Sequence, residues 1–129
     1  MNPWECRREF RRIPVSHDHT VRFRLGGKVL ERVPIANLSA GGCFAILVRE
    51  HFTNFREGTI LVDFTLEHSD LPSTPITAKV VRVVKGLTEI TENDIGLGIL
   101  FLSTSAKFTE WVDSYVATYN TLTGKTRAS

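Results

Sequence analysis

Alternation of apolar and polar residues at every second position restricts the fold of this chain more than any other feature. In residues 20 to 25, Val21, Phe23 and Leu25 are separated by two arginines. Successive side chains on a strand point to opposite faces, so this pattern predicts a strand with one buried face. Residues 59 to 66 alternate in the same way. The chain is therefore predicted to be mainly β.

Further strands are predicted from short apolar or β-branched segments between turn signals. Gly26-Gly27 is a strong hairpin signal after the first strand. The other predicted strands are residues 28–35, 43–48, 76–84 and 95–102, and the last of them contains Gly96 and Gly98. Turns or loops are expected at residues 37–42, 49–58, 69–75 and 87–94. Glycines inside a strand mark a bulge or a close approach of two backbones.

The C-terminal part of the chain has helical periodicity. Ser105 is a good N-cap, and an apolar stripe follows at helical spacing: Phe108, Trp111, Val112, Tyr115 and Tyr119. Six or seven short strands and one terminal helix predict a small antiparallel β-barrel with the helix packed across it. We expect a single domain over residues 1–129, with a flexible arm at 1–12, the barrel at 20–102 and the helix at 105–121.

The positive charge of the chain is concentrated in one short segment. The formal net charge is +2. Of the sixteen basic and fourteen acidic side chains, residues 5 to 12 hold four and two, so twelve of each remain elsewhere. A nucleic-acid surface needs many phosphate contacts spread over a face, so a general DNA or RNA binder is not expected. One small anionic ligand at the arginine segment fits this distribution better.

Several classes of protein are not expected from the sequence. No apolar run approaches the roughly 20 residues that span a bilayer, and the N-terminus has no signal-peptide stretch, so we expect a cytoplasmic protein. Cys6 and Cys43 are too few for a disulfide framework and match no zinc spacing. The spacing of the residues indicates no catalytic triad or carboxylate pair, so we expect neither an enzyme nor a cofactor. The polar outer face of the C-terminal helix favours a monomer.

Two of the four histidines have a spacing that metal sites use. His17 and His19 lie two apart near a strand start, where both could point the same way. The sequence indicates no third or fourth ligand, so no metal site is expected. His51 and His68 are interpreted as surface loop residues.

Two short segments carry the groups that a nucleotide ligand would need. They are Arg8-Glu9-Phe10-Arg11-Arg12 and Asn37-Leu38-Ser39-Ala40-Gly41-Gly42. Guanidinium groups can fork onto guanine O6 and N7 or phosphate oxygens, and they stack on purine faces. Asn37 and Ser39 offer short polar side chains to another base edge, and Gly42 lets the backbone come close. Together these groups predict a site for a guanine nucleotide.

The first segment resembles the RxxxR signature of the PilZ domain family. Arg8 and Arg12 match it because an aliphatic residue, Ile13, follows directly. Arg7 and Arg11 have the same spacing, so the register stays open.

The second segment is similar to the D/N-x-S-x-x-G signature of the same family, and the two occur in the family's order. Asn37, Ser39 and Gly42 match it. The closing residues 95–101, followed by a short helix, also resemble the end of a PilZ domain. The resemblance covers roughly residues 5 to 120.

The resemblance implies a six-stranded antiparallel barrel of the split-barrel type, with cyclic di-GMP bound on its outside. The two arginines would clamp guanine and phosphate from the arm, while Asn37 and Ser39 would hold a base from the barrel side. Arg82 falls near a position where many members stack a side chain on the ligand, and Gly41 belongs to the same turn as Gly42. One or two ligand molecules would bind.

The function that the resemblance implies is that of a bacterial, non-enzymatic receptor. Binding would order the arm, burying Trp4 and Phe10, and would signal to an unidentified protein of motility, pilus, polysaccharide or transcription machinery. One alternative is a PilZ-like adaptor that works by protein contacts without nucleotide. Another is a nucleic-acid binder that uses the arginine arm, which the neutral remainder of the chain disfavours.

Overall fold

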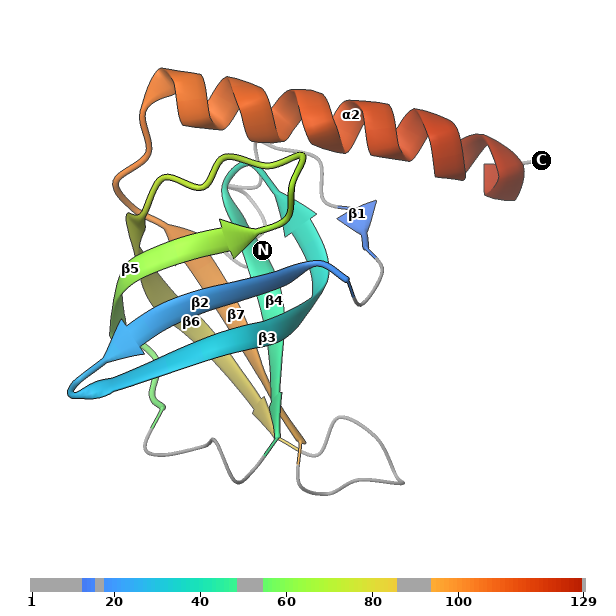
Figure 1. Ribbon diagram of the computed structural model, residues 1–129. Coiled ribbons are helices and arrows are strands. Elements are labelled where there is room, and N and C mark those ends of the chain that lie inside the picture. Colours follow the sequence, from blue (N-terminus) through green and yellow to red (C-terminus); the bar gives the residue numbers. More distant parts are fainter. Residues whose placement is uncertain (1–12, 16–17, 49–54, 86–93, 129) are drawn as a thin grey trace, which may run out of the picture.

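The computed structural model describes residues 13–15, 18–48, 55–85 and 94–128. They form seven strands and one helix (Figure 1). The elements are β1 (Ile13–Pro14), β2 (Thr20–Leu25), β3 (Lys28–Ser39), β4 (Gly42–Val48), β5 (Ile60–Glu67), β6 (Ile76–Lys85), β7 (Asp94–Phe101) and α2 (Ala106–Ala128). The expected flexible arm at residues 1–12 and the hairpin tip at 87–93 lie outside the described residues.

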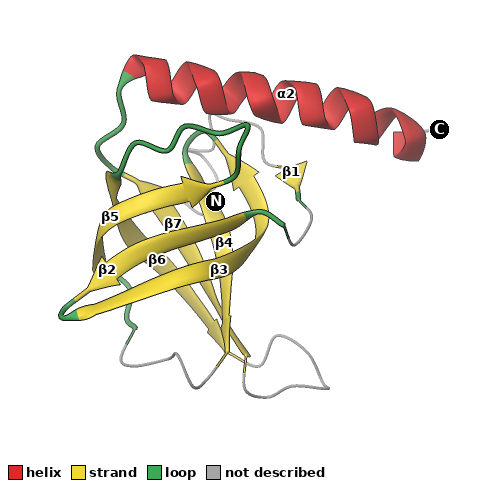
Figure 2. Ribbon diagram, viewed as in Figure 1, coloured by secondary structure: helices red, strands yellow, loops and turns green. Residues whose placement is uncertain are grey.

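Six of the strands close into an antiparallel barrel. Their order is β3-β2-β5-β6-β7-β4, and an additional pairing between β3 and β4 closes the ring. β1 is a seventh strand that pairs with β3 outside this ring. Closure leaves the barrel strands without open edges. The predicted fold, a mainly β six-stranded barrel with a terminal helix, is confirmed (Figure 2).

Strand β3 is longer than the sequence indicated, and it changes partner along its length. Its first part pairs with β2, from Leu25↔Lys28 to Thr20↔Pro34, and its last residues pair with β4. The predicted turn at 37–42 was therefore wrong for residues 37–39, which are in the strand. Turn-like composition misled here because Asn and Ser occupy ladder positions, and only Ala40 and Gly41 form the turn.

Aromatic side chains connect the barrel interior to the helix. Phe23 and Phe64 are fully buried and stack with their ring centroids 5.9 Å apart. Phe64 contacts Phe101, whose ring meets Phe108 of α2 edge to face at 5.9 Å. Such pairs contribute more than area burial alone. They fix α2 across one end of the barrel (Figure 1).

The helix begins where the sequence predicted, but it buries a different face. Ser105 Oγ accepts a hydrogen bond from the Phe108 N–H at 3.1 Å, so the predicted N-cap is confirmed. Phe108, Val112 and Val116 are buried at four-residue spacing. Trp111, which was predicted to lie in the core stripe, is 50% exposed, and that part of the prediction was wrong.

Helix α2 also continues past residue 121, to Ala128. No helix in the described part of the chain has the length and apolar content needed to cross a membrane.

Candidate functional site

The turn between β3 and β4 is held by one buried hydroxyl group. Ser39 is 3% exposed, and its Oγ accepts hydrogen bonds from the N–H groups of Gly41 and Gly42, each at 3.2 Å. The same hydroxyl lies 3.3 Å from the Gly42 carbonyl oxygen, to which it donates. A serine that bonds the backbone two and three residues on stabilises a tight turn. The Ser39 hydroxyl is therefore used within the turn in this structure.

Gly42 is required by the close approach of β4 to β7. A Cβ atom at this position would lie 2.1 Å from the Ile99 carbonyl oxygen. Neighbouring backbone also fixes the turn, since the Phe101 N–H donates to the Gly41 carbonyl at 2.9 Å. The two glycines thus serve the geometry of the turn.

Asn37 differs from Ser39 because its polar atom has no partner. Its Oδ1 is buried and accepts no hydrogen bond from any residue in the described ranges. A buried acceptor without a partner costs about 1–3 kcal/mol. Such a group in a native fold is accounted for by a missing partner, and a ligand is one such partner.

Asn37 is one end of a row that runs across the outside of the barrel. In register, Asn37 lies opposite Phe44, Phe44 opposite Gly98, and Gly98 opposite Arg82. Directly paired residues share a face of the sheet, and Arg82 is exposed. Three strand spacings separate the ends of the row by about 14 Å. A surface of this length can accommodate a base between an amide and a guanidinium group.

Gly98 leaves the middle of this row without a side chain. A Cβ atom here would lie 3.1 Å from the Cβ of Arg82. Phe44 on one side is half-buried and Arg82 on the other is exposed. The missing side chain allows β6 and β7 to approach closely at this point, as a glycine within a strand indicates.

Strand β1, which directly follows the arginine segment in the sequence, pairs with β3 at Asn37. Ile13 pairs with Leu38, and Pro14 pairs with Asn37. The Val15 N–H also donates to the Ala36 carbonyl at 3.1 Å. The candidates Arg7, Arg8, Arg11 and Arg12 themselves lie outside the described residues, as do Trp4 and Phe10.

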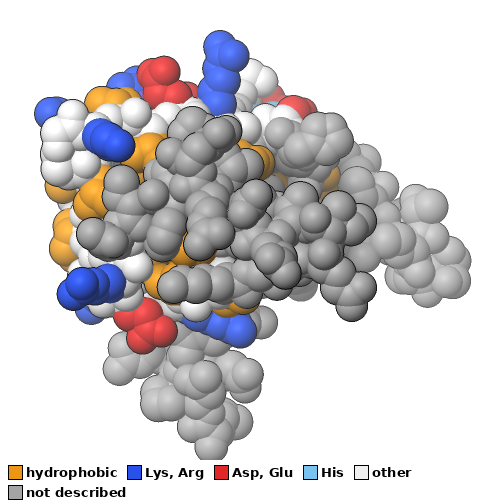
Figure 3. All heavy atoms as spheres, turned by 90° about the horizontal axis from the view of Figure 1, so that it is seen from below, with side chains coloured by type: hydrophobic (Ala, Val, Ile, Leu, Met, Phe, Trp, Pro, Cys, Tyr) orange, Lys and Arg blue, Asp and Glu red, His pale blue; other side chains and the backbone are white. Residues whose placement is uncertain are grey.

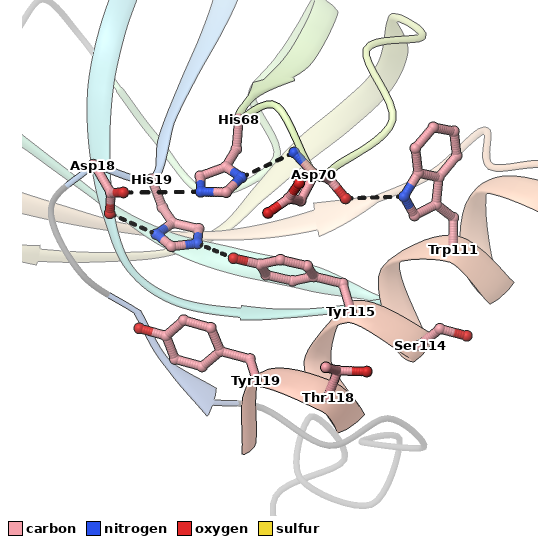
Figure 4. Close-up of a pocket in the computed structure, with 9 residues that line it drawn as sticks. All are labelled: Asp18, His19, His68, Asp70, Trp111, Ser114, Tyr115, Thr118 and Tyr119. Atoms are coloured by element: carbon pink, nitrogen blue, oxygen red, sulfur yellow. Dashed lines mark hydrogen bonds and ion pairs between the residues drawn. The ribbon is translucent and has the colours of Figure 1, made fainter. Parts of the chain in front are cut away.

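A second group of polar side chains gathers beneath α2 (Figure 4). His19 is 2% exposed; its Nδ1 lies 3.1 Å from Asp18 Oδ1, and its Nε2 lies 2.5 Å from the Tyr115 hydroxyl. The His68 ring stacks on His19 at 4.2 Å between centroids. His68 lies in the loop directly after β5, as interpreted from the sequence, but its side chain is largely covered, with 15% exposed. His17 and His51 lie outside the described residues.

This cluster contains three groups that could ligate a metal. One ligand atom each from Asp18, His19 and His68 lies within 4.8 Å of the others. The two imidazole planes, however, are only 13° from parallel. A metal lies in the plane of an imidazole ligand at about 2 Å from nitrogen, so one ion cannot lie in both planes. In this arrangement the histidines serve hydrogen bonding and stacking.

No local sequence pattern predicts this cluster. His19 and Tyr115 are 96 positions apart, and only barrel closure and helix docking bring them together. The unusual composition of the segment, with Asp18 next to His19, is a weak clue at best.

Among the described residues that are coloured in Figure 3, basic side chains form no continuous patch. The Lys and Arg side chains coloured in that view lie scattered around its rim, and acidic groups lie among some of them. One described ion pair, Arg24 with Asp63 at 3.2 Å, is exposed at both ends. The described basic side chains in this view are therefore accompanied by acidic groups and do not form a continuous basic face.

The sequence matches the profile of the PilZ domain over residues 6–117. No curated protein matches it. Several solved structures are similar in fold, among them the following three. YcgR from Escherichia coli in complex with c-di-GMP superposes with a TM-score of 0.74 at 17% identity, over 95% of this chain and 50% of that chain.

The other two structures are an isolated PilZ domain and a longer protein. The PilZ domain of Escherichia coli YcgR with c-di-GMP gives a TM-score of 0.71 at 16% identity, over 95% of this chain and 98% of that one. The Bacillus subtilis inhibitor of motility (MotI/DgrA) gives 0.73 at 16% identity, over 91% and 52%. The chain thus spans about half the length of YcgR and of the motility inhibitor.

Proposed function

The chain belongs to the PilZ domain family, and from this premise we propose that it binds cyclic di-GMP as a non-enzymatic receptor. The observation that carries the proposal is the pairing of Ile13 with Leu38 and of Pro14 with Asn37. This ladder places the two residues that directly follow the arginine segment alongside the second signature segment. The names of two similar structures, YcgR and its PilZ domain, include the same ligand.

The pairing limits where the arginines can reach. The Cα atom of Arg12 is about 3.8 Å from that of Ile13 by covalent geometry. Ile13 lies beside Leu38, between the two motif residues Asn37 and Ser39. An arginine side chain from Arg12, and one from Arg8 a few residues earlier, can therefore meet a ligand that lies on β3.

In the proposed site the barrel residues divide into two roles. Asn37 contacts the ligand, because its buried Oδ1 lacks a partner among the described residues and can accept from a guanine N–H. Arg82, at the other end of the row, stacks on or pairs with the ligand. Ser39, Gly41 and Gly42 act mainly by shaping the turn, through the hydrogen bonds of the Ser39 hydroxyl.

The arginines supply the charge that the barrel lacks. Arg8 and Arg12 fork onto the guanine edge and the phosphates. We further propose that binding orders residues 1–12 against the barrel and that this new surface meets a downstream protein. A ligand shifts such an equilibrium only through its higher affinity for the ordered state. Hydrogen exchange at residues 7–12 should slow at saturating cyclic di-GMP, and unchanged exchange would refute the ordering step alone.

Paired arginine variants test the site and its register. Isothermal titration with cyclic di-GMP should show an affinity at least about a hundredfold weaker for Arg8→Ala/Arg12→Ala, since each charged hydrogen bond contributes about 1.5–3 kcal/mol. Arg7→Ala/Arg11→Ala should lose less if the first register is correct. Arg22→Ala/Arg56→Ala is the matched control, because both of its arginines are exposed.

Each outcome of this series decides something. Equal loss in the two arm variants would place both registers in the site. Equal loss in the control pair would show that only net charge matters and would contradict a specific site. If the parent protein bound no cyclic di-GMP, the receptor function would be refuted, and the alternative would be an adaptor that works by protein contacts.

A further inference from the structure

A pocket under α2 lies outside the proposed nucleotide site. It has a volume of about 570 Å³, which is within the usual range for ligand pockets. Helix α2 forms one wall and the segments next to β2 and β5 form the other (Figure 4). We call it the aromatic pocket; its lining residues are Asp18, His19, His68, Asp70, Trp111, Ser114, Tyr115, Thr118 and Tyr119.

Aromatic rings form a continuous wall of this pocket. His68 stacks on His19, lies 5.6 Å from Tyr115, and Tyr115 lies 5.8 Å from Tyr119, measured between ring centroids. Trp111 stands at the rim, where its Nε1–H donates to the Asp70 carbonyl oxygen at 2.9 Å. Electron-rich ring faces attract cations, most strongly when the site is partly desolvated.

The charge of the lining is negative. Among the described residues, the lining contains two carboxylates, Asp18 and Asp70, and no lysine or arginine. Asp18 contacts the histidines, whereas the Asp70 carboxylate accepts no hydrogen bond from a described residue. Burial raises the pKa of Tyr115 most, the charges of Tyr119, Asp70 and Asp18 act in the same direction, and together they bring it to about 12. The two aspartates therefore place negative charge close to Tyr115 in the pocket.

We propose that the aromatic pocket receives the arginine side chain of a partner protein. A guanidinium group is planar and weakly hydrated, stacks on aromatic rings and carries five donors. The pocket offers it ring faces together with separated acceptors, namely the Asp70 carboxylate and the Ser114 and Thr118 hydroxyls along α2. A lysine ammonium is a compact, strongly hydrated charge that uses fewer of these groups.

The exposed position of Trp111 indicates a protein as the source of this group. The indole is 50% exposed at the rim although its Nε1–H is fixed to the Asp70 carbonyl. A rigid, half-exposed tryptophan next to a charged pocket is typical of a contact that buries one anchoring side chain. The charge of the pocket and this rim together fit an arginine presented by another chain.

A short peptide tests the pocket on the full-length protein. The probe is acetyl-Gly-Arg-Gly-amide, and the same peptide with citrulline is its neutral isostere. Binding is followed by 1H–15N correlation spectra at the Trp111 indole and at the amides of Ser114 and Thr118. The chain has two tryptophans, so a Trp111→Phe variant assigns the indole signal.

We expect saturable chemical-shift changes with the arginine peptide. The same peptide with lysine in place of arginine should bind at least fivefold more weakly, and the citrulline peptide should not bind. Asp70→Asn should weaken the arginine peptide at least fivefold. Asp113→Asn should leave it unchanged, since Asp113 is exposed on α2 but does not line the pocket. Both variants should bind cyclic di-GMP like the parent, so this test can fail independently of the proposed function.

Several results would overturn the proposal. Equal binding of the citrulline peptide, or no effect of Asp70→Asn, would show that the positive charge is not recognised. Tetramethylammonium binding without arginine binding would identify a site for quaternary ammonium compounds. Tighter peptide binding by Arg8→Ala/Arg12→Ala would mean that the chain's own arm competes for the pocket, and a Zn²⁺-dependent change of the His19 and His68 signals would indicate a metal site.

Discussion

Pro14 lies directly opposite Asn37 in the ladder between β1 and β3. This pair joins the residues that follow the arginine segment to the first residue of the second signature. The two segments are far apart in the sequence, and the barrel alone would not hold them together. Strand β1 is outside the closed ring, and its pairing with β3 places Ile13 and Pro14, the residues that directly follow the arginine segment, beside Leu38 and Asn37.

Asn37→Ala should separate binding from stability. Asn37 Oδ1 has no hydrogen-bond partner among the described residues, so removing this unsatisfied acceptor should leave the free energy of unfolding unchanged or raise it by up to about 1–3 kcal/mol. The affinity for cyclic di-GMP should fall at least about tenfold, which corresponds to about 1.4 kcal/mol. Urea unfolding and calorimetric titration of the same preparation measure both. A large loss of stability with unchanged affinity would assign Asn37 to the fold.

Ser39→Ala should, in contrast, lower the free energy of unfolding. The variant leaves the N–H groups of Gly41 and Gly42 without their acceptor, and an unsatisfied buried donor costs about 1–3 kcal/mol. Ser73→Ala is the control because Ser73 is exposed. Chemical unfolding compares them. Equal stability of the two variants would show that the hydroxyl does not hold the turn.

Gly42→Ala should destabilise the barrel by more than about 3 kcal/mol. The added Cβ would lie 2.1 Å from the Ile99 carbonyl oxygen, and its three nearest atoms all belong to the backbone. Because no flexible side chain can move away, the strain should exceed that of ordinary overpacking. Gly27→Ala is the matched control, since nothing lies within 4 Å of its Cβ position. If thermal unfolding found both variants equally stable, β4 and β7 would not approach as closely as described.

Tyr115 should ionise only at unusually high pH. The chain has two tyrosines, Tyr115 and Tyr119, so Tyr119→Phe leaves one phenol whose tyrosinate absorbance can be titrated. Burial, together with the charges of Tyr119, Asp70 and Asp18, raises the pKa of Tyr115 to about 12 from 10.0. An ordinary titration in Tyr119→Phe would contradict the packing of Tyr115 on His19.

The same shift affects stability at alkaline pH. The folded state favours the neutral phenol, so its contribution is complete below pH 10 and is lost as the pH rises from about 10 to 12. Tyr115→Phe should therefore lose less stability than the parent across this interval. The comparison is made by urea unfolding at several pH values.

The barrel could be predicted because its strands carry local signals. Val21 and Phe23 alternate with arginines and are fully buried, and the hairpin at Gly26 has the positive φ of 61° that its turn residue suggested. Ser105 similarly marked the start of α2. These features depend on neighbours in the sequence, which is why a pattern of period two or a capping residue is enough to find them.

Other features depend on contacts between distant segments. The exposure of Trp111 follows from how α2 is rotated on the barrel, with Val116 buried at 1%, and helical spacing alone does not fix that rotation. The stacking of His68 on His19 likewise needs β2 and β5 to be neighbours. For the candidate site, the motif residues could be named from the sequence. The sequence alone could not show that the Ser39 hydroxyl bonds within the turn, or that Asn37 Oδ1 is buried without a hydrogen bond from a described residue. Both features depend on the pairing of β3 with β4.

Calorimetric titration of the full-length protein with cyclic di-GMP, beside GTP, tests the central claim most directly. The account predicts saturable binding at micromolar affinity or tighter for cyclic di-GMP, no binding of GTP, and a stoichiometry of one or two. An absence of binding at high micromolar cyclic di-GMP would contradict the receptor function while leaving the PilZ fold unchanged.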